Sequence, residues 1–240
     1  MAVAVVQEFN LGDGASATAR TIDMDAANGR AITAASSLVA WLAQPAQSNR
    51  TYTCSSDVDG AFTQLSVIVN NDYRVSMFYL DNLTGGDHVI TMTANASTTF
   101  TFGVVEFSGT DTTDSKDVES SLIETVNSGS HPCAAAGAID TVAGVGIVTV
   151  GITNAGTGAA TKHADYTLAH TEDSSGPTWL AQYRVSAGAL TDEDAIWTAA
   201  GTNRKGGSMM ASFKPAAGGA TPPTNPFIGP FGWPLRGPIA

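Results

Sequence analysis

The sequence predicts an all-β protein: an antiparallel two-sheet sandwich, jelly-roll-like, with an extended Pro-rich C-terminal arm. Three observations lead to this prediction. Short segments alternate between apolar and polar residues, turn-forming residues separate them at close spacing, and helical periodicity is almost absent. Alternation with a period of two places apolar side chains on one face of a strand, as a sandwich requires. We expect the sandwich domain to span residues 1–214 and the arm to span residues 215–240.

The clearest alternation lies in residues 73–111, at the centre of the chain. Its three strand-like segments are 73–80, 88–94 and 99–107. A turn containing Gly85 and Gly86 separates the first two, because glycine adopts the positive φ that a tight reversal needs. We expect the three segments to form an antiparallel meander.

The first seventy residues predict further short strands. These strands are 2–10, 16–24, 36–43, 52–56 and 62–70. In residues 36–43 (SSLVAWLA) a helix competes with a strand, and Pro45 ends either element. The dipeptide Asn28-Gly29 is a strong tight-turn signal.

The chain becomes polar and acidic after Asp111, where a surface loop and an edge strand at 118–126 both remain open. The strands predicted beyond this region are 138–154, 166–171, 178–186, 195–200 and 207–214. Within residues 138–154, three glycines indicate the close approach of another backbone: Gly144, Gly146 and Gly151.

Composition and charge exclude several classes of partner. Hydrophobic residues make up 43% of the 240 residues, which is enough for a packed core. The formal charge of −11, without any cluster of Lys or Arg, argues against nucleic acid and against anionic membranes. No apolar run approaches the ~20 residues of a membrane span, and the first residues lack the pattern of a signal peptide. We therefore expect a soluble protein made in the cytoplasm.

Acidic residues are the first candidates for chemistry. The two groups that could supply carboxylates for glycoside hydrolysis or calcium binding are Asp57, Asp59 and Asp72, and Asp111, Asp114 and Asp117. Neither group matches the twelve-residue calcium loop, and Asp is common in turns because it forms local hydrogen bonds. We interpret both groups as surface turns.

Other residue types give no catalytic constellation either. The sequence contains no nucleophile elbow, no P-loop and no His-Glu-x-x-His motif, and its four histidines are scattered. His163 and His170 are expected in solvated loops, and three tryptophans are expected in the core rather than on a sugar-binding platform: Trp41, Trp179 and Trp197. For Cys54 and Cys133, a disulfide and two buried thiols both remain open. We expect no catalytic residue, no metal and no cofactor.

The composition changes abruptly at Pro215. Residues 215–240 hold seven of the ten prolines, and proline at this spacing favours an extended, polyproline-like chain. The segment also carries the residues expected to bind a partner: Phe227, Ile228, Phe231, Trp233, Leu235, Arg236 and Ile239. It could fold back on its own domain, or it could dock into a groove on a neighbouring subunit. We favour docking, because a stiff segment loses less entropy on binding and its aromatic residues supply anchors.

Three segments of this chain resemble a pattern found in bacterial surface proteins and phage virion proteins. They are Phe78-Tyr79-Leu80-Asp81-Asn82, the glycine turn and strand at 85–91, and Val105-Glu106-Phe107-Ser108-Gly109-Thr110-Asp111. The closing segment 209–216 resembles the last strand of the same family, so the likeness covers roughly residues 50–216. The motifs are structural, and they imply a β-sandwich more strongly than a function. The proline-rich arm is not part of the shared pattern.

Within this family, the chain resembles a tailed-phage capsid decoration (cement) protein. The resemblance implies a non-enzymatic virion structural protein that stabilises the shell through its arm. Its partners would be the major capsid protein or other virion subunits, and it would form a homo-oligomer, with a trimer expected. The alternatives are a phage tail or fibre subunit and a carbohydrate-binding or adhesive module.

Overall fold

The computed structural model is almost entirely β-structure. It describes residues 2–12, 15–28, 30–45, 49–70, 73–123, 130–131, 139–153, 160–173, 177–199 and 206–217. Within these ranges the chain forms seventeen strands and one five-residue helix. The first half of the chain and the second half each fold into a pair of sheets.

The first half contains nine strands and the helix. They are β1 (Ala4–Leu11), β2 (Ala17–Asp23), α1 (Met24–Asn28), β3 (Ser37–Pro45), β4 (Tyr52–Ser56), β5 (Gly60–Ala61), β6 (Thr63–Asn70), β7 (Tyr73–Leu80), β8 (Val89–Thr98) and β9 (Thr101–Ser108). Strands β1-β9-β3-β7-β6 form what we call the first inner sheet, and β2-β8-β4-β5 form the first outer sheet.

The second half contains eight strands. They are β10 (Lys116–Ile123), β11 (Ser130–His131), β12 (Val145–Thr153), β13 (Ala160–Thr161), β14 (Thr167–Asp173), β15 (Thr178–Ser186), β16 (Trp197–Ala199) and β17 (Gly206–Phe213). Strands β10-β17-β12-β15-β14 form the second inner sheet, and β11-β16-β13 form the second outer sheet.

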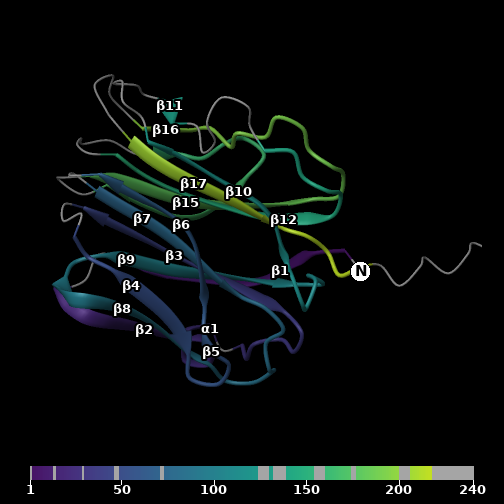
Figure 1. The fold of residues 1–240 in the computed structure, drawn as a ribbon, viewed down its shortest axis with the longest axis horizontal. Coiled ribbons are helices and arrows are strands. Elements are labelled where there is room, and N and C mark those ends of the chain that lie inside the picture. The colour runs from purple at the N-terminus through teal and green to yellow at the C-terminus, as the bar shows by residue number, and fades with distance from the viewer. Residues whose placement is uncertain are drawn as a thin grey trace, which may run out of the picture.

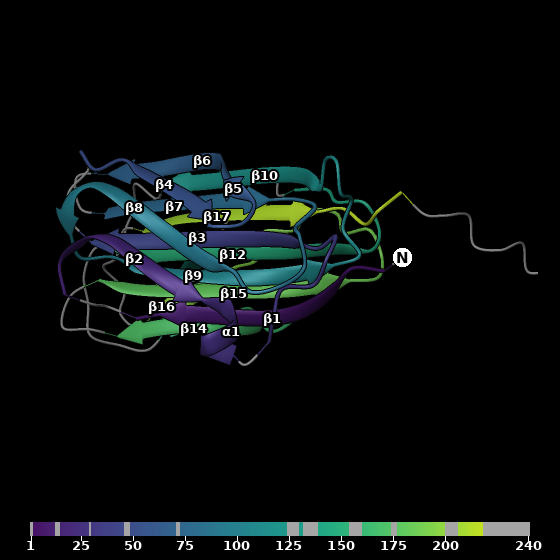
Figure 2. The same cartoon turned by 90° about the horizontal axis from the view of Figure 1, so that it is seen from below.

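The four sheets are stacked as layers, with the two inner sheets packed against each other (Figure 1). One buried cluster lies between the inner sheets, a second between the first inner and first outer sheets, and a third between the second inner and second outer sheets. The strands of the inner sheets run along the length of the body (Figure 2). The N-terminus and the chain leaving β17 lie at the same end of the body.

The two halves share one strand topology. If the two-residue strand β5 is left out, each half has eight strands, and numbering them 1 to 8 gives the order 1-8-3-6-5 for the inner sheet and 2-7-4 for the outer sheet in both halves. All paired strands are antiparallel. This order is that of a jelly roll in which the fifth strand pairs with the sixth. The predicted all-β antiparallel sandwich is therefore confirmed, and the described residues contain it twice.

The predicted meander at 73–111 is wrong. Strands β7 and β9 both pair with β3 in the first inner sheet, whereas β8 lies in the first outer sheet and pairs with β2 and β4. The turn that precedes β8 crosses the sandwich instead of reversing within a sheet, and its Leu83 is buried in the core between the sheets. Alternation identifies a strand but does not show which sheet the strand joins. The sequence therefore predicted the strands at these positions but the wrong pairing between them.

The central inner strands are buried on both faces because a sheet covers each side of them. The side chains of β3 are buried from Ser37 to Gln44, and every side chain of β12 and β17 is buried. A strand covered on both sides has no reason to alternate, so residues 38–43 (LVAWLA) are apolar without interruption. The competition between helix and strand at 36–43 is thus decided in favour of a strand.

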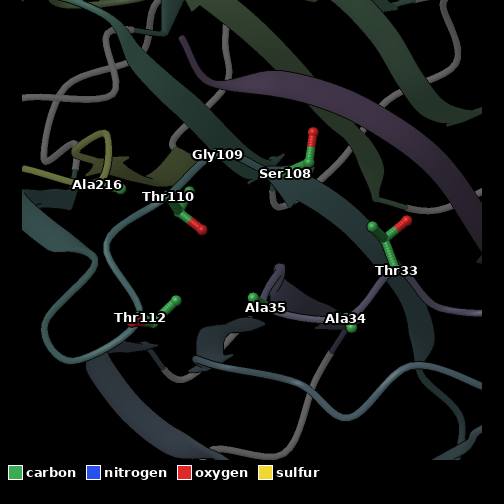
Figure 3. Close-up of a pocket in the computed structure, with 8 residues that line it drawn as sticks. All are labelled: Thr33, Ala34, Ala35, Ser108, Gly109, Thr110, Thr112 and Ala216. Atoms are coloured by element: carbon green, nitrogen blue, oxygen red, sulfur yellow. The ribbon is translucent and has the colours of Figure 1, made fainter. Parts of the chain in front are cut away.

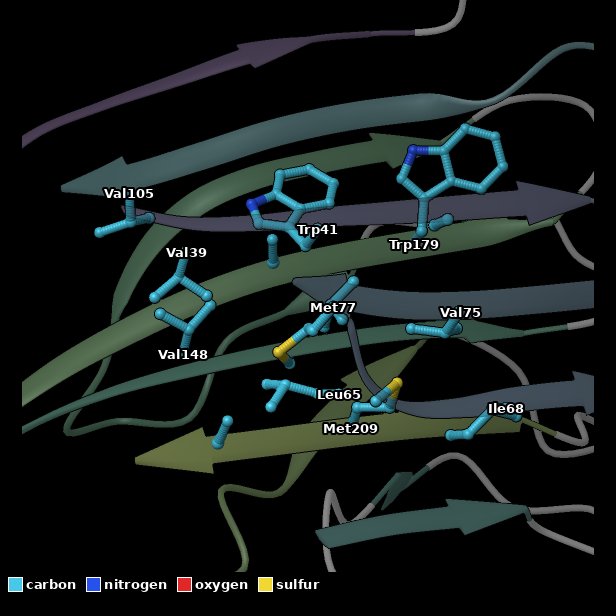
Figure 4. Close-up of a cluster of buried hydrophobic side chains, with 14 of the residues drawn as sticks. Val39, Trp41, Leu65, Ile68, Val75, Met77, Val105, Val148, Trp179 and Met209 are labelled. Carbon is cyan, nitrogen blue, oxygen red and sulfur yellow. The ribbon is translucent and has the colours of Figure 1, made fainter. Parts of the chain in front are cut away.

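The core between the inner sheets joins the two halves of the chain (Figure 4). The first inner sheet contributes side chains that include Val39, Trp41, Val75, Met77 and Val105, and the second contributes Val148, Trp179 and Met209. Trp41 and Trp179 are both 1% exposed, and Trp197 is fully buried on the far side of the second inner sheet. The expected core position of these tryptophans is confirmed.

Two aromatic rings of the first inner sheet lie directly on glycines of the second. A Cβ atom on Gly146 would lie 2.7 Å from the Phe107 ring, and a Cβ atom on Gly207 would lie 2.5 Å from the Tyr73 ring. The Tyr73 hydroxyl also donates a hydrogen bond to the Gly206 carbonyl oxygen at 2.5 Å. The missing side chains of these glycines therefore allow the inner sheets to pack at this distance.

The glycines of residues 138–154 were predicted to mark the approach of another backbone, and this is wrong for all three. The group that approaches Gly146 is the Phe107 ring, and the group that approaches Gly151 is the Trp197 ring, 2.5 Å from the position of a Cβ atom. Gly144 has a φ of +80° in the turn before β12, and the group nearest its Cβ position is the Pro215 ring at 3.4 Å. The sequence revealed the need for space but not the side chain that fills it.

The substitution Gly146→Ala is expected to destabilise the contact between the inner sheets. Its methyl group would displace the buried Phe107 ring, so we expect the free energy of unfolding to fall by about 1–3 kcal/mol. Denaturant titration measures the change. Gly188→Ala is the control, because no atom lies within 4 Å of its Cβ position, and we expect a change of at most about 0.5 kcal/mol. Equal effects of the two substitutions would contradict this account.

A second contact between the halves joins Glu8 of β1 to Tyr183 of β15. Burial raises the pKa of Glu8, and burial together with the hydrogen bond to Glu8 raises the pKa of Tyr183 to about 12. An acid whose pKa is higher in the folded state binds more protons there, so folding weakens as the pH rises through the interval between its unfolded and folded pKa values. The contact between Glu8 and Tyr183 therefore contributes least to stability at alkaline pH.

We expect the free energy of unfolding to fall between pH 10 and about 12, partly because Tyr183 ionises at about 10 in the unfolded chain and at about 12 in the folded chain. The variant Tyr183→Phe should show a smaller fall over this interval than the unmodified protein. Denaturant midpoints at several pH values measure both curves. Parallel curves would show that Tyr183 has no part in the pH dependence.

Candidate docking site

The chain beyond β17 remains hydrogen-bonded to the body as far as Ala216. We call residues 214–217 the root, because they lead into the proline-rich segment. The Lys214 N–H donates to the Ser115 carbonyl oxygen at 2.7 Å, the Asp111 N–H donates to the Lys214 carbonyl oxygen at 3.1 Å, and the Ala216 N–H donates to the Gly109 carbonyl oxygen at 2.8 Å. The root is thus hydrogen-bonded along residues 109–115, the segment that connects the two halves.

Asp81, at the end of β7, holds this connecting segment in place. Its Oδ1 accepts the Ser37 hydroxyl at 3.0 Å and also the Ser115 hydroxyl, and its Oδ2 accepts the Ser115 N–H at 3.2 Å. The Ser37 hydroxyl lies 2.7 Å from the hydroxyl of Thr110. One carboxylate therefore ties β3, β7 and the start of the second half together at the end of the body where the root leaves.

The predicted acidic group at 111–117 is a set of turn and pairing residues at the same place. Asp111 Oδ1 accepts the N–H and the hydroxyl of Thr113 at 2.9 and 2.8 Å, and these hydrogen bonds lower the pKa of Asp111. Asp114 accepts a hydrogen bond from Lys214 Nζ at 2.8 Å, which raises the pKa of Lys214. Asp117 accepts the Ser212 hydroxyl at 3.3 Å. Their interpretation as turn residues is confirmed for Asp111.

A pocket of about 280 Å³ opens beside the root (Figure 3). Its lining residues come from the turn before β3, the end of β9, the connecting segment and the root: Thr33, Ala34, Ala35, Ser108, Gly109, Thr110, Thr112 and Ala216. All eight are small and none is charged. We call this the root pocket. Its lining suits a neutral, mostly apolar group rather than an ion.

The first wall of the root pocket is fixed by a buried carboxylate. Glu106 of β9 is fully buried, and its Oε1 accepts the Thr33 N–H at 2.8 Å while its Oε2 accepts the Gln7 side-chain amide at 2.6 Å. The Ala35 N–H donates to the Leu83 carbonyl oxygen at 2.9 Å. The turn is thereby hydrogen-bonded to β9 on one side and to the crossing turn on the other.

The backbone conformation of two lining residues is also specific. Gly109 has a φ of +74°, and a Cβ atom there would lie 2.5 Å from the Ala2 carbonyl oxygen. Ala35 has a φ of 59°, a left-handed conformation that an alanine adopts only when its surroundings impose it. The pocket therefore depends on tertiary contacts rather than on local sequence preference.

The seven arm residues predicted to bind a partner lie outside the described residues, as does Cys133. Their role and the extent of the arm stay predictions. Cys54 is a buried free cysteine, and burial raises the pKa of its thiol.

Of the other predicted acidic group, Asp72 lies outside the described residues, and Asp59 contributes to a buried cluster that resembles a catalytic triad in composition. His88 Nδ1 lies 2.9 Å from Ser56 Oγ and 3.7 Å from Asp59 Oδ2. In a hydrolytic triad the hydroxyl and the carboxylate bind opposite ring nitrogens. Here both lie at Nδ1, His88 Nε2 lies 2.6 Å from the Thr84 carbonyl oxygen, and Ser56 Oγ accepts the Val58 N–H at 3.1 Å. The cluster ties two turns together and does not position a nucleophile.

The remaining histidine predictions have mixed outcomes. His170 lies in β14 and packs on Trp41 with ring centroids 5.9 Å apart, so its expected position in a solvated loop is wrong. His163 precedes the turn into β14 and packs edge-on against Tyr166. Strand β14 begins at Thr167, one residue later than predicted. One face of this strand is partly buried, and His170 packs on that face.

Within the described ranges, no group of three or more His, Cys, Asp or Glu side chains is arranged to hold a metal ion. The one helix found there, α1, has five residues and is too short to cross a bilayer.

Sequence reasoning missed the root pocket, Asp81 and Glu106. The residues that line the pocket are Ala, Gly, Ser and Thr, and residues of these types form no motif that can be recognised in a sequence. Glu106 did leave a signal, because it is the one charged residue within the apolar strand TFGVVEFS. A charge in a buried strand needs partners, so it could have indicated a structural tie at this end of the body.

No protein-family model matches this chain, and searches of curated proteins and of solved structures found no significant match. The functional argument therefore depends on the residues themselves.

The variant Asp81→Ala tests the tie at the root. It leaves the hydroxyl and the N–H of Ser115 without their acceptor, so we expect the free energy of unfolding to fall by about 1–3 kcal/mol. Asp87→Ala is the matched control, an exposed carboxylate in the same turn, with an expected change of at most about 0.5 kcal/mol. Thermal or denaturant unfolding measures both variants. An unchanged free energy of unfolding in Asp81→Ala would show that this carboxylate does not stabilise the contacts at the root.

Proposed function

We propose that the chain is a non-enzymatic structural protein that attaches to a larger assembly through its proline-rich C-terminal segment. The assembly that best fits the sequence resemblance is a tailed-phage virion, with this protein decorating the capsid and binding the major capsid protein. The double sandwich would form the body on the shell, and the segment would bridge to a neighbouring subunit.

The observation that carries this proposal is the position of the segment. Six of the ten prolines and six large apolar residues follow directly on a root that is hydrogen-bonded to the body. Exposed apolar side chains lower solubility unless a surface covers them. A stiff segment with a fixed point of departure loses less entropy when it binds such a surface. The segment therefore has the physical properties of a docking element.

The polar side chains of the body form structural hydrogen bonds, and this supports a non-enzymatic role. Ser56, His88 and Asp59 are engaged in holding turns, and Glu106 and Asp81 hold the walls near the root. The root pocket has no titratable lining residue that could transfer a proton. The formal charge of −11 also opposes binding to nucleic acid.

The alternative function, glycan binding, requires exposed aromatic side chains in a cluster. Trp41, Trp179 and Trp197 are buried, as is Tyr73, whereas Tyr79 and Tyr183 are partly buried and packed against the central core. These positions favour assembly over sugar recognition.

Deletion of residues 218–240 is expected to abolish attachment and to leave the body folded. The deletion keeps the hydrogen bonds of Lys214 and Ala216 to the body, so we expect far-ultraviolet circular dichroism and the unfolding midpoint to stay close to those of the full chain. Attachment is measured by co-sedimentation with virus particles assembled without this protein.

Point variants sharpen the same test within the full chain. The pair Phe231→Ala and Trp233→Ala should reduce occupancy on the particles by tenfold or more, because buried aromatic anchors carry much of the energy of an interface. Thr221→Ala and Thr224→Ala, in the same segment, form the matched control and should retain full occupancy. Full occupancy after the deletion would refute the proposed function.

A further inference from the structure

We propose that the root pocket binds an aromatic side chain from the C-terminal segment of a second copy of this chain. This inference rests on the proposed docking function of the segment and names the partner for one of its contacts. The protein would thereby associate with itself through exchanged segments before or during attachment to a larger assembly.

The chemistry of the pocket fits one uncharged side chain. Its volume of about 280 Å³ is at the lower limit of the roughly 300–1,000 Å³ typical of sites for drug-sized ligands. Its lining consists of alanines, a glycine, a serine and threonines, and it has no charged group to fix an ionic ligand. Phe227, Phe231 and Trp233 of the segment are uncharged aromatic residues of suitable size.

Hydrogen bonds within the chain hold the walls of the pocket. Glu106 holds the Thr33 turn, the Ala216 N–H is bound to Gly109, and the Thr110 hydroxyl lies 2.7 Å from that of Ser37. These contacts fix three separate chain segments around one hollow (Figure 3). A preformed pocket needs little ordering on binding, which favours capture of a side chain from a stiff segment.

The length of the segment argues that the occupant comes from another molecule. The pocket is lined by Ala216, so the segment departs from its rim, and Phe227 is ten residues beyond Ala217. Pro222, Pro223 and Pro226 lie in this interval, and the polyproline conformation expected from the sequence, with a rise of about 3.1 Å per residue, would place Phe227 about 30 Å from its own root. A neighbour's segment can reach this pocket from outside, and the same exchange in return gives a closed, symmetric assembly.

Blocking the pocket is the first test. Ala34→Leu and Ala216→Leu each add bulk to a lining residue, and Ala217→Leu adds the same bulk at the exposed neighbouring position. Sedimentation velocity of the full-length proteins over a range of concentrations measures self-association. We expect the unmodified chain and Ala217→Leu to associate equally, and both blocked variants to associate about 30-fold more weakly. Circular dichroism confirms that each variant is folded.

Complementation between two full-length variants is the decisive test. One variant, Ala216→Leu, keeps the segment but has a blocked pocket. The other keeps the pocket but carries Phe227→Ser, Phe231→Ser and Trp233→Ser in the segment. Neither should associate alone, and an equimolar mixture should form a one-to-one complex. A mixture that stays monomeric, or an unmodified chain that is monomeric at all concentrations, would overturn the inference.

The two proposals fail in different ways. If deletion of residues 218–240 abolishes attachment to particles but the complementing mixture stays monomeric, the segment docks on the particle and the root pocket does not receive it. If the deletion leaves attachment intact, the proposed function is wrong whatever the mixture does.

Discussion

The contact between the two inner sheets is the constraint on which the rest of the body depends. Phe107 and Tyr73 reach across to Gly146 and Gly207, where any side chain would collide with the ring. This close packing covers the second face of both inner sheets, so their central strands have no side exposed to water. Such strands must be apolar on both faces, and each polar group within them, as at Glu106, needs a partner in the protein.

Two carboxylates, those of Glu106 and Asp81, have their partners at the end of the body where the root leaves. Glu106 binds the turn before β3, and Asp81 binds the start of the second half, which in turn holds the root. Glu106 and Asp81, whose carboxylates are hydrogen-bonded within the protein, therefore also fix the point at which the C-terminal segment leaves the body. Stability of the double sandwich and presentation of the segment are consequently linked through two carboxylates.

The sequence predicted the strands far better than their arrangement. Period-two alternation in β8 reflects one face turned to a core and one turned to water, and it located that strand correctly. The same signal cannot say whether a strand joins the inner or the outer sheet, so a crossing turn at 81–87 was interpreted as a hairpin. Nor could it reveal the repeated topology, because that repeat lies in the order of pairing, whereas the residues of the two halves are different.

The site was less predictable than the fold for a related physical reason. The aromatic residues of the segment predict a binding role by their composition alone, because large apolar side chains that stay exposed lower solubility. A pocket made of small residues gives no such signal, because its shape depends on the left-handed Ala35, on Gly109 and on a carboxylate in the strand beneath. A sequence can reveal apolar side chains that need a binding surface, but the shape of a pocket depends on tertiary structure. The inference that the segment binds the root pocket therefore required both the sequence and the structure.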